Sequence, residues 1–562
     1  MSWEVQIMKS RISFFNGTVF RKDLTRFAPT WIIYTAGCLL VILNITAADD
    51  PALTKYILGN RLSLMAFANF GYAPVCALLL FGDLFNARLC NALHAAPLRR
   101  ETWFFTHLLS GLVFCLIPYM AVAVCVLPGL AWNWAAAPVW LLGSVLEFLF
   151  FFSLAVFCVF CTGSRFAAAL FYGLLNFLSL FASWFVSVIY SPLLTGVEIG
   201  TGWANPLCPL INLIEHSDWM TWFDKISRSQ HGLGYCWTYL LILTGVGIVL
   251  LGISLALYQR RRLECAGDFV AVKAIAPVFL VVYALAAAVV FQCFDSIFIG
   301  NSTVSLFFAV GLAVGWFTGL MLLRRTVRVF SGRSLLGFLV LGGTLLVSIL
   351  LTWADPLGIT RWVPSPGQVQ KVQLAAGSTS SHPQDVEVSD QQKIEDITDI
   401  HAQAIDEHVS EEARSHTETV SLTLRYQLCD GSTAERSYEL DVDTELAQRL
   451  VPYFSDPQVI LQYEDWDTFL AQLYQIRIDY NDQLVITGAD AVSLAQAIRQ
   501  DCEDGNMVQF WQYHEDDYGK VDMALSVDIV VGDKDLDFAV YSDCEHTLQW
   551  LKDHGMYPDY LQ

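Results

Sequence analysis

Long apolar runs alternate with short polar segments from residue 29 to residue 353. Nine of these runs are long enough to cross a bilayer as helices, because about 20 apolar residues span its hydrocarbon core. The predicted spans are Pro29–Ala47, Ser63–Phe81, Trp103–Leu127, Ala136–Cys161, Phe166–Tyr190, Cys236–Tyr258, Ala274–Phe294, Thr303–Leu323 and Leu335–Leu351. Eight or ten spans remain alternatives. The pattern predicts a polytopic α-helical membrane protein with about nine spans.

Residues 1–28, ahead of the first span, mix apolar and basic positions. The basic side chains are Lys9, Arg11, Arg21, Lys22 and Arg26. Such a mixture is typical of a helix that lies on the membrane surface with its basic face toward anionic headgroups. An unstructured basic leader is the alternative. We therefore predict an amphipathic N-terminal segment.

After residue 353 the apolar runs stop. Residues 354–389 are rich in Pro, Ser, Gln and Gly and are interpreted as a linker. Residues 390–562 alternate between helical and strand periodicity, with a hairpin signal at Cys429–Ser432 between two alternating segments. This part is predicted to be a soluble α+β domain. The loop Ser191–Tyr235 holds shorter apolar patches, which predict either re-entrant or surface-lying segments, or an ordinary folded loop.

Composition and charge support this division. The 562 residues are 55% hydrophobic, with a mean hydropathy of +0.46 and a net charge of -21. Residues 1–355 carry 21 Lys and Arg against 15 Asp and Glu, and the remaining residues carry 12 against 39. No basic footprint for nucleic acid is present in either part, so no nucleic-acid partner is expected. An acidic outer domain would attract cationic peptides, although solubility explains the charge more simply.

Loop charges predict the orientation. With the N-terminus inside, the inner segments carry 17 Lys and Arg and the outer ones only four, Lys55, Arg61, Lys225 and Arg228. Because basic loops stay in the cytoplasm, this arrangement is favoured. Nine spans then place the C-terminal domain outside the cell.

The polar island Asn86–Glu101 lies between the second and third predicted spans, on the inner side. A transport protein needs an energy source, and an ATPase would carry a phosphate-binding loop. The only Gly-Lys pair, Gly519-Lys520, lacks that context. We therefore expect no ATPase site, no catalytic site and no cofactor in this chain.

Other candidate residues have simpler interpretations. Glu147 is the one acid in the middle of a span, and a hydrogen-bonding role is favoured over proton coupling. Gly311, Gly315 and Gly319 form a doubled GxxxG, which predicts close helix packing within the chain or in a dimer. His401 and His408 share a helix face and are expected to be structural, with metal binding as the alternative. His514–Asp517 is read as solvated acid, and no metal site is predicted.

The first six spans resemble ABC-2 type permeases of bacteria. The resemblance rests on residues 20–40, FRKDLTRFAPTWIIYTAGCLL, and on residues 86–111, NARLCNALHAAPLRRETWFFTHLLSG. In the second segment Pro97, Arg99 and Arg100 match the family's turn back into the membrane. Residues 29–260 would form the permease region and 261–353 three additional spans. The C-terminal segments IEDITDIHAQAI and LTLRYQLCDGSTAERSYEL are similar to the extracytoplasmic domain of longer Gram-positive permeases.

The resemblance implies a permease subunit in a bacterial cell membrane, powered by a separate ATPase subunit that binds the ATP and Mg. That partner would contact a coupling loop made of Asn86, Arg88, His94, Pro97, Arg99, Arg100 and Glu101. A second permease copy or a paralogue would complete the pathway. A membrane sensor or scaffold with an outer binding domain, and a secondary carrier, are the alternatives. Substrate and direction stay open, with export of peptides or antimicrobial compounds as one possibility.

Overall fold

The structure is a computed structural model. It describes residues 14–42, 51–95, 98–126, 136–197, 199, 203–217, 233–261, 265–299, 305–377, 384–408, 419–441, 444–454, 463, 465–479, 484–504, 523–532, 534–541 and 544–557. The chain divides into two compact units, which are treated separately below. The helical unit comprises Met1–Ile189 and Gly200–Leu346, and the mixed unit comprises Tyr190–Ile199 and Val347–Gln562.

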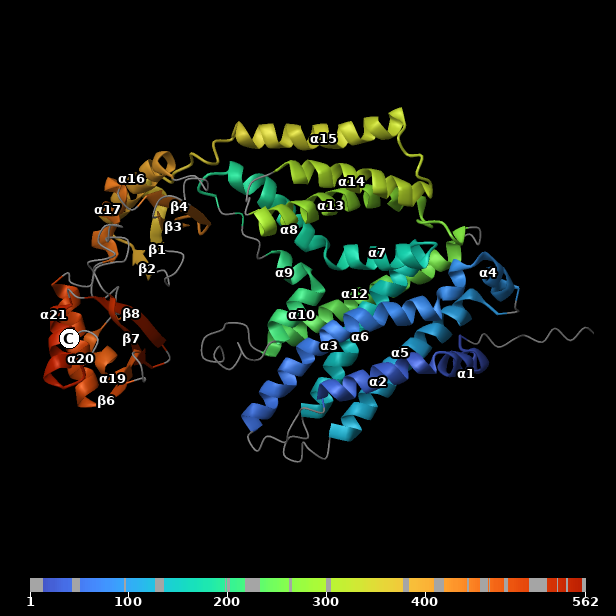
Figure 1. The fold of residues 1–562 in the computed structure, drawn as a ribbon, viewed down its shortest axis with the longest axis horizontal. Coiled ribbons are helices and arrows are strands. Elements are labelled where there is room, and N and C mark those ends of the chain that lie inside the picture. Colours follow the sequence, from blue (N-terminus) through green and yellow to red (C-terminus); the bar gives the residue numbers. More distant parts are fainter. Residues whose placement is uncertain are drawn as a thin grey trace, which may run out of the picture. The chain divides into compact units, whose positions relative to one another are not determined.

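The helical unit is built around one central helix, α6. Its helices are α1 (Gly17–Arg26), α2 (Ala28–Ile42), α3 (Pro51–Leu80), α4 (Ala87–His94), α5 (Arg100–Val126), α6 (Ala136–Cys161), α7 (Arg165–Asn176), α8 (Leu178–Tyr190), α9 (Ala204–Leu207), α10 (Pro209–Ser217), α12 (Leu233–Arg260), α13 (Ala276–Ile299), α14 (Leu306–Arg324) and α15 (Gly332–Trp353). Helices α3 and α12 pack against α6 (Figure 1). The most apolar window of α6 is 78% buried, whereas that of α15 is not buried at all. The apolar side chains of α15 are therefore largely exposed in the structure.

Every predicted span coincides with a helix, but not every helix is long enough to cross a membrane. Among the described residues, six helices are: α5, α6, α12, α13, α14 and α15. Helices α7 and α8 are bent by 58° against each other and count as a seventh span if they are taken as one. The structure thus supports six to seven spans.

The first two predicted spans account for the difference from nine. Helix α2 is described over 15 residues, Ala28–Ile42, which cover about 22 Å at 1.5 Å per residue, and residues 43–50 of the predicted span region lie outside the described residues. Helix α3 has 30 residues, and the part whose side chains are described, Leu64–Leu80, is apolar but by itself too short to count as a span. Because α2 and α3 form a pair, leaving out both does not change which side of the membrane the later loops lie on.

The loop predicted over Ser191–Tyr235 is partly folded onto the helices. Helix α10 packs against α3 and α12, and its Leu210 and Leu213 side chains are buried. The first apolar patch is therefore a helix that docks on the bundle. The second patch, Trp219–Phe223, lies outside the described residues.

The mixed unit contains the same arrangement twice, ββαββα. The first copy holds β1 (Val369–Gly377), β2 (Gln384–Val388), α16 (Gln391–Glu407), β3 (Thr419–Leu428), β4 (Thr433–Asp441) and α17 (Glu445–Phe454). Its antiparallel strands follow the order β2-β1-β3-β4. Gly431 has a φ of +84° in the β3–β4 turn, which favours glycine.

The second copy holds β5 (Leu473–Asp479), β6 (Leu484–Thr487), α20 (Ala489–Glu503), β7 (Met523–Val531), β8 (Lys534–Tyr541) and α21 (Glu545–Asp553), preceded by α19 (Trp466–Gln472). The order β6-β5-β7-β8 repeats that of the first sheet. Each copy has its own hydrophobic core between sheet and helices. The predicted α+β class is confirmed, and the C-terminal part is a tandem of two small domains.

Two features of the mixed unit correct the prediction. The range 354–389, interpreted as a linker, contains β1 and β2, so the folded region begins earlier than composition indicated. These strands alternate buried Val and Leu with exposed Gln and Lys, and the polar half of that alternation gave the linker-like composition. In addition, the segment Tyr190–Ile199 belongs to this unit: the Ser437 amide donates a hydrogen bond to the Gly196 carbonyl oxygen (3.0 Å).

Candidate functional site

The segments predicted to lie inside the cell meet at one end of the helical unit. The Arg26 guanidinium lies 4.0 Å from the carboxylate of Asp83, which links the N-terminal segment to the loop after α3. A Cβ added at Gly163 would lie 2.5 Å from the carbonyl oxygen of Asp268, so these two loops are in backbone contact. Asp268 in turn lies 3.9 Å from Arg325, in the loop after α14. Direct contacts therefore join the basic segments. This agrees with the prediction, made from their Lys and Arg content, that these loops lie on the same side of the membrane.

The predicted coupling loop forms a short helix, α4, at this end. Asn86 caps it, and its Oδ1 accepts hydrogen bonds from the amides of Arg88 (3.0 Å) and Leu89 (3.4 Å). His94 is the last residue of α4, and Pro97 lies outside the described residues. The predicted turn at Pro97 is thus untested, whereas the helical character of the loop is established.

Arg100 and Glu101 attach the end of this loop to α12. The Arg100 Nη1 atom lies 2.8 Å, 3.0 Å and 3.1 Å from the carbonyl oxygens of Tyr258, Gln259 and Arg261. The Glu101 carboxylate accepts a hydrogen bond from Gln259 Nε2 (3.0 Å). Because the last carbonyls of a helix lack partners within it, a cation here both caps α12 and complements its dipole. Arg100 therefore has a structural role.

The outward face of the loop keeps different side chains. Arg88 and Arg99 are exposed, and their guanidinium groups have no hydrogen bond or ion pair within the described residues. Leu89 is 48% exposed beside them, whereas Cys90 is buried against the bundle. The exposed residues available to another chain are thus Arg88 and Leu89 on α4 and Arg99 in the segment between α4 and α5.

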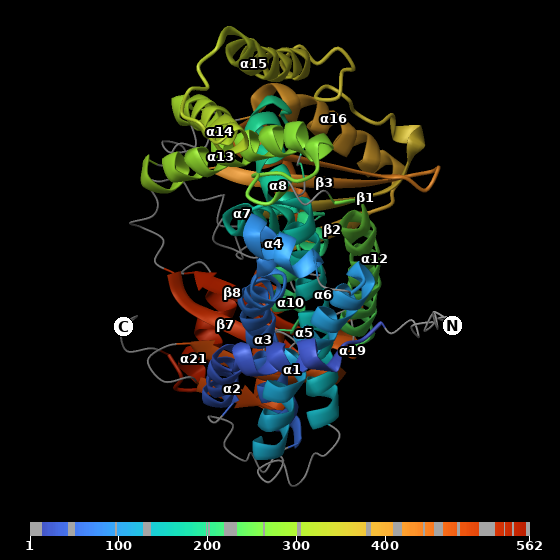
Figure 2. The same ribbon diagram turned by 90° about the vertical axis from the view of Figure 1, so that its right-hand side faces the viewer.

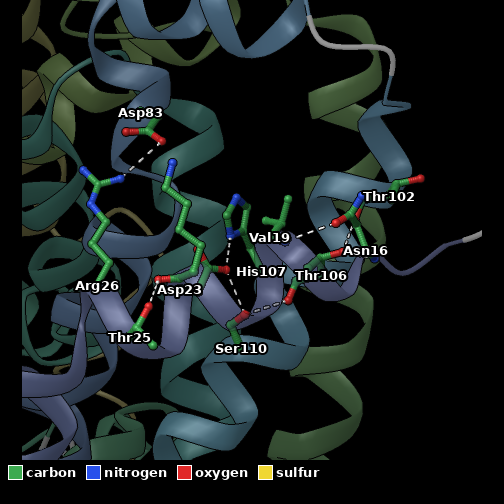
Figure 3. Close-up of polar contacts among 11 residues, drawn as sticks. Asn16, Val19, Asp23, Thr25, Arg26, Asp83, Thr102, Thr106, His107 and Ser110 are labelled. Carbon is green, nitrogen blue, oxygen red and sulfur yellow. Dashed lines mark hydrogen bonds and ion pairs between the residues drawn. The ribbon is translucent and has the colours of Figure 1, made fainter.

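Polar contacts join α1 to α5 (Figure 3). The Asp23 carboxylate lies 2.8 Å from both His107 Nδ1 and Ser110 Oγ, and all three side chains are buried. One helical turn before Ser110 on α5, Thr106 Oγ1 accepts a hydrogen bond from the backbone N–H of Asn16 (3.1 Å). Because a carboxylate only accepts, Ser110 and His107 are the donors. The amphipathic segment is thereby held along the third predicted span.

These residues were not predicted from the sequence. A signal was present, because Thr106, His107 and Ser110 share one side of a helix near its inner end, and Asp23 is an acid in a basic segment. Polar side chains inside a span call for partners. The partner itself, 84 positions away in the chain, has no local signature.

A second buried polar cluster surrounds Glu147. Its Oε2 accepts a hydrogen bond from Asn69 Nδ2 (3.1 Å), which also reaches the carbonyl oxygen of Ser144 (3.2 Å). The Asn69 Oδ1 atom accepts from the hydroxyls of Tyr34 (2.9 Å) and Tyr119. The expected hydrogen-bonding role of Glu147 therefore has a defined partner on α3.

The doubled GxxxG packs within the chain. A Cβ added at Gly315 would lie 2.7 Å from Ala287 Cβ and 2.8 Å from Ala284 Cα, and Gly311 and Gly319 face α13 equally closely. Helices α13 and α14 lie side by side in both views (Figures 1 and 2). Of the two predicted uses of these glycines, intrachain packing is the one that the structure supports.

His401 and His408 hold the first ββαββα domain together. The two ring nitrogens of His401 are bonded to the hydroxyls of Tyr438 (2.9 Å) and Tyr426 (3.0 Å). Burial, with a contribution from Arg436, lowers the pKa of His401 to about 4. No three described His, Cys, Asp or Glu residues are grouped to hold a metal ion, and His514–Asp517 lies outside the described residues.

The fold and these clusters define a polytopic α-helical membrane protein with a tandem C-terminal α+β region. No protein-family model matches the chain, and no curated protein matches its sequence.

Proposed function

We propose that this chain is the membrane-spanning permease subunit of an ATP-driven transporter and that a separate ATPase subunit binds the outward face of α4. The observation that carries the proposal is the attachment of the coupling loop. Helix α4 is exposed, yet Arg100 and Glu101, next to it, are bonded to the end of α12. A displacement imposed on α4 is therefore transmitted to α5 and α12.

The buried link between α1 and α5 supports the same proposal. Asp83 lies directly before α4 and is paired with Arg26 at the end of α1, while Asp23 is bonded to His107 on α5. The elements around α4 thus form a connected assembly, which is suited to carrying force from a partner into the spans. The ATP and Mg would be bound by the partner subunit, and two permease chains would form the pathway.

The proposed orientation places the C-terminal domains outside the cell. Its support is that the basic loops share one end, and that Gly196, from a loop predicted to be outside, is bonded to Ser437 of the first domain. Cys429, an exposed cysteine in the β3–β4 turn, provides the test. A membrane-impermeant maleimide should label it in intact cells, and Cys429→Ser should remove that label. Labelling only after permeabilisation would refute the orientation.

The partner is tested with charge reversal at the exposed arginines of the coupling loop, Arg88 on α4 and Arg99 after it. We expect the tagged full chain to copurify with an ATPase, and Arg88→Glu with Arg99→Glu to abolish this without altering expression or thermal stability. Arg328→Glu is the matched control, because Arg328 is an exposed arginine in another loop at the same end. Absence of any ATPase in the wild-type preparation, or equal retention in both variants, would refute the proposal.

A further inference from the structure

The central helix contains a carboxyl group that the proposed function does not use. Glu147 lies near the middle of α6 and its side chain is only 1% exposed. Among the described residues it receives one hydrogen bond, from the neutral Asn69 amide, and Oε1 has no partner. The Oγ atom of Ser144, one turn away on the same helix, is likewise buried without a partner there.

No described cation is positioned to balance a charge on Glu147. The described charged side chains of the helices packed against α6 belong to residues near the helix ends: Arg100, Glu101 and His107 of α5, Arg165 of α7, and Arg260 of α12. The side chains of Lys55 and Arg61 on α3 lie outside the described residues. The titratable groups deeper in these helices and in α2 are hydroxyls and thiols: Tyr34, Cys38, Tyr72, Cys76, Cys115, Tyr119, Tyr172, Tyr239 and Tyr258. Glu147 forms no ion pair within the described residues.

An ionised carboxylate in such surroundings is unfavourable. Burial without a cation strongly disfavours the charged form, and one amide hydrogen bond does not compensate for the lost hydration. The neutral acid keeps the bond from Asn69 on Oε2 and carries its proton on Oε1. A water molecule between Oε1 and the Ser144 hydroxyl would satisfy both unpartnered groups.

We propose that Glu147 is a proton-binding site of the helical unit, occupied in the conformation described here and emptied only when the α3–α6 contact opens. Release transfers one proton to water and leaves a carboxylate, so the packing of α3 on α6 and the occupancy of the site are linked. The inference does not depend on an ATPase partner.

Hydrogen bonds link the surroundings of Glu147 to the surface of the bundle on the α2 side. The Glu147 carboxyl, Asn69 and the Tyr34 hydroxyl form a continuous chain of hydrogen bonds. Tyr34 also lines an open groove of about 600 Å³ between α2 and α3. The groove has room at Gly37 and Gly71, where an added Cβ would meet nothing within 4 Å. Tyr34 thus connects the surface of the bundle with the buried acid.

The test uses the purified full chain in lipid nanodiscs. Infrared spectroscopy of the wild type at pH 7 should show the C=O stretch of a protonated carboxyl in an apolar site, and Glu147→Gln should remove that band. The thermal unfolding midpoint of the wild type should fall as the pH is raised from 6 to 9. In Glu147→Gln, the contribution of Glu147 to this decrease should be absent. Because glutamine is neutral and retains an acceptor for Asn69, this variant should fold; failure to fold would itself contradict a neutral carboxyl.

Two further comparisons complete the test. Tyr34→Phe should retain the band but accelerate its loss after a jump to high pH, because Asn69 loses one of the hydrogen bonds that hold it beside Glu147 and the α3–α6 contact opens more readily. Replacing choline chloride with sodium chloride at high pH should leave the midpoint unchanged. Stabilisation by sodium that depends on Glu147 would refute the proton in favour of an alkali cation, and a wild type without the band would refute the proposal altogether.

Discussion

Arg99 and Arg100 are neighbours with the same chemistry and different surroundings, and we predict opposite outcomes for their replacement. Arg100 donates to the carbonyl oxygens at the end of α12, whereas Arg99 is exposed. Arg100→Met should therefore destabilise the last turn of α12, and Arg99→Met should not. The pair separates a structural arginine from one that is available to a partner.

The expected magnitude follows from the contacts. One nitrogen serves three carbonyls, so we count one to two hydrogen bonds to a charged donor, at roughly 1.5–3 kcal/mol each, and a helix-dipole contribution of about 0.3–1 kcal/mol. Partial exposure of Arg100 reduces this sum, and a loss of about 2–4 kcal/mol is expected. Arg100→Lys keeps the charge and one donor and should recover about half of it. An exposed site such as Arg99 should change stability by no more than about 0.5 kcal/mol.

Hydrogen exchange measured by mass spectrometry reports this locally. A loss of 2 kcal/mol corresponds to roughly 30-fold faster exchange of the amides in the last turn of α12, and 4 kcal/mol to nearly 1000-fold. The peptides of α13 and α14 are the internal reference. Overlapping exchange profiles for Arg100→Met and Arg99→Met would show that the contacts of Arg100 do not hold α12.

Three further predictions concern packing, pH and the N-terminal helix. Gly315→Ala should destabilise the α13–α14 pair by about 1–3 kcal/mol in thermal unfolding, because the new Cβ meets backbone, whereas Gly342→Ala, where the Cβ has open space, should not; equal effects would contradict the packing. The pKa of His401 is about 4 in the folded protein and 6.5 in the unfolded chain, so the stability that is present above pH 6.5 should be lost toward pH 4, by up to about 3 kcal/mol. Amide hydrogen exchange of β3 relative to β7 measures this loss. Relative protection that stays constant with pH would contradict the prediction. Asp23→Ala should free α1 from His107 and accelerate tryptic cleavage within α1 at least tenfold; unchanged cleavage would mean that the contact does not hold α1.

The regular features of this protein could be predicted from its sequence. Hydropathy located every long helix of the helical unit, because burial in lipid and burial in protein both require apolar residues. The positions of the basic loops predicted which helix ends lie together, and the contacts of Asp83 and Asp268 confirm that grouping. Helix count was less certain: apolar length predicted nine spans, whereas six to seven are supported among the described residues.

The polar clusters could be predicted only in part. Glu147 and Gly315 were recognised because each is unusual within its own span. Their partners, Asn69 and Ala287, are ordinary residues whose position is decided by how the helices pack. A single sequence contains the buried acid but not the amide opposite it, and the same limitation concealed the contact between Asp23 and α5.

The duplication in the mixed unit shows what the buried histidine contributes. In α16 the buried positions include Ile394, Ile397 and His401, and in α20 the same spacing gives Ala491, Leu494 and Ile498. The second copy forms the same sheet with an apolar residue where the first has His401, so the fold itself does not require the polar group. Burial, together with the nearby Arg436, makes the protonated form of this imidazole unfavourable. The stabilities of the two copies should therefore diverge as the pH falls. The first copy should unfold locally at acidic pH, while the second, which has Ile498 in place of this histidine, remains folded.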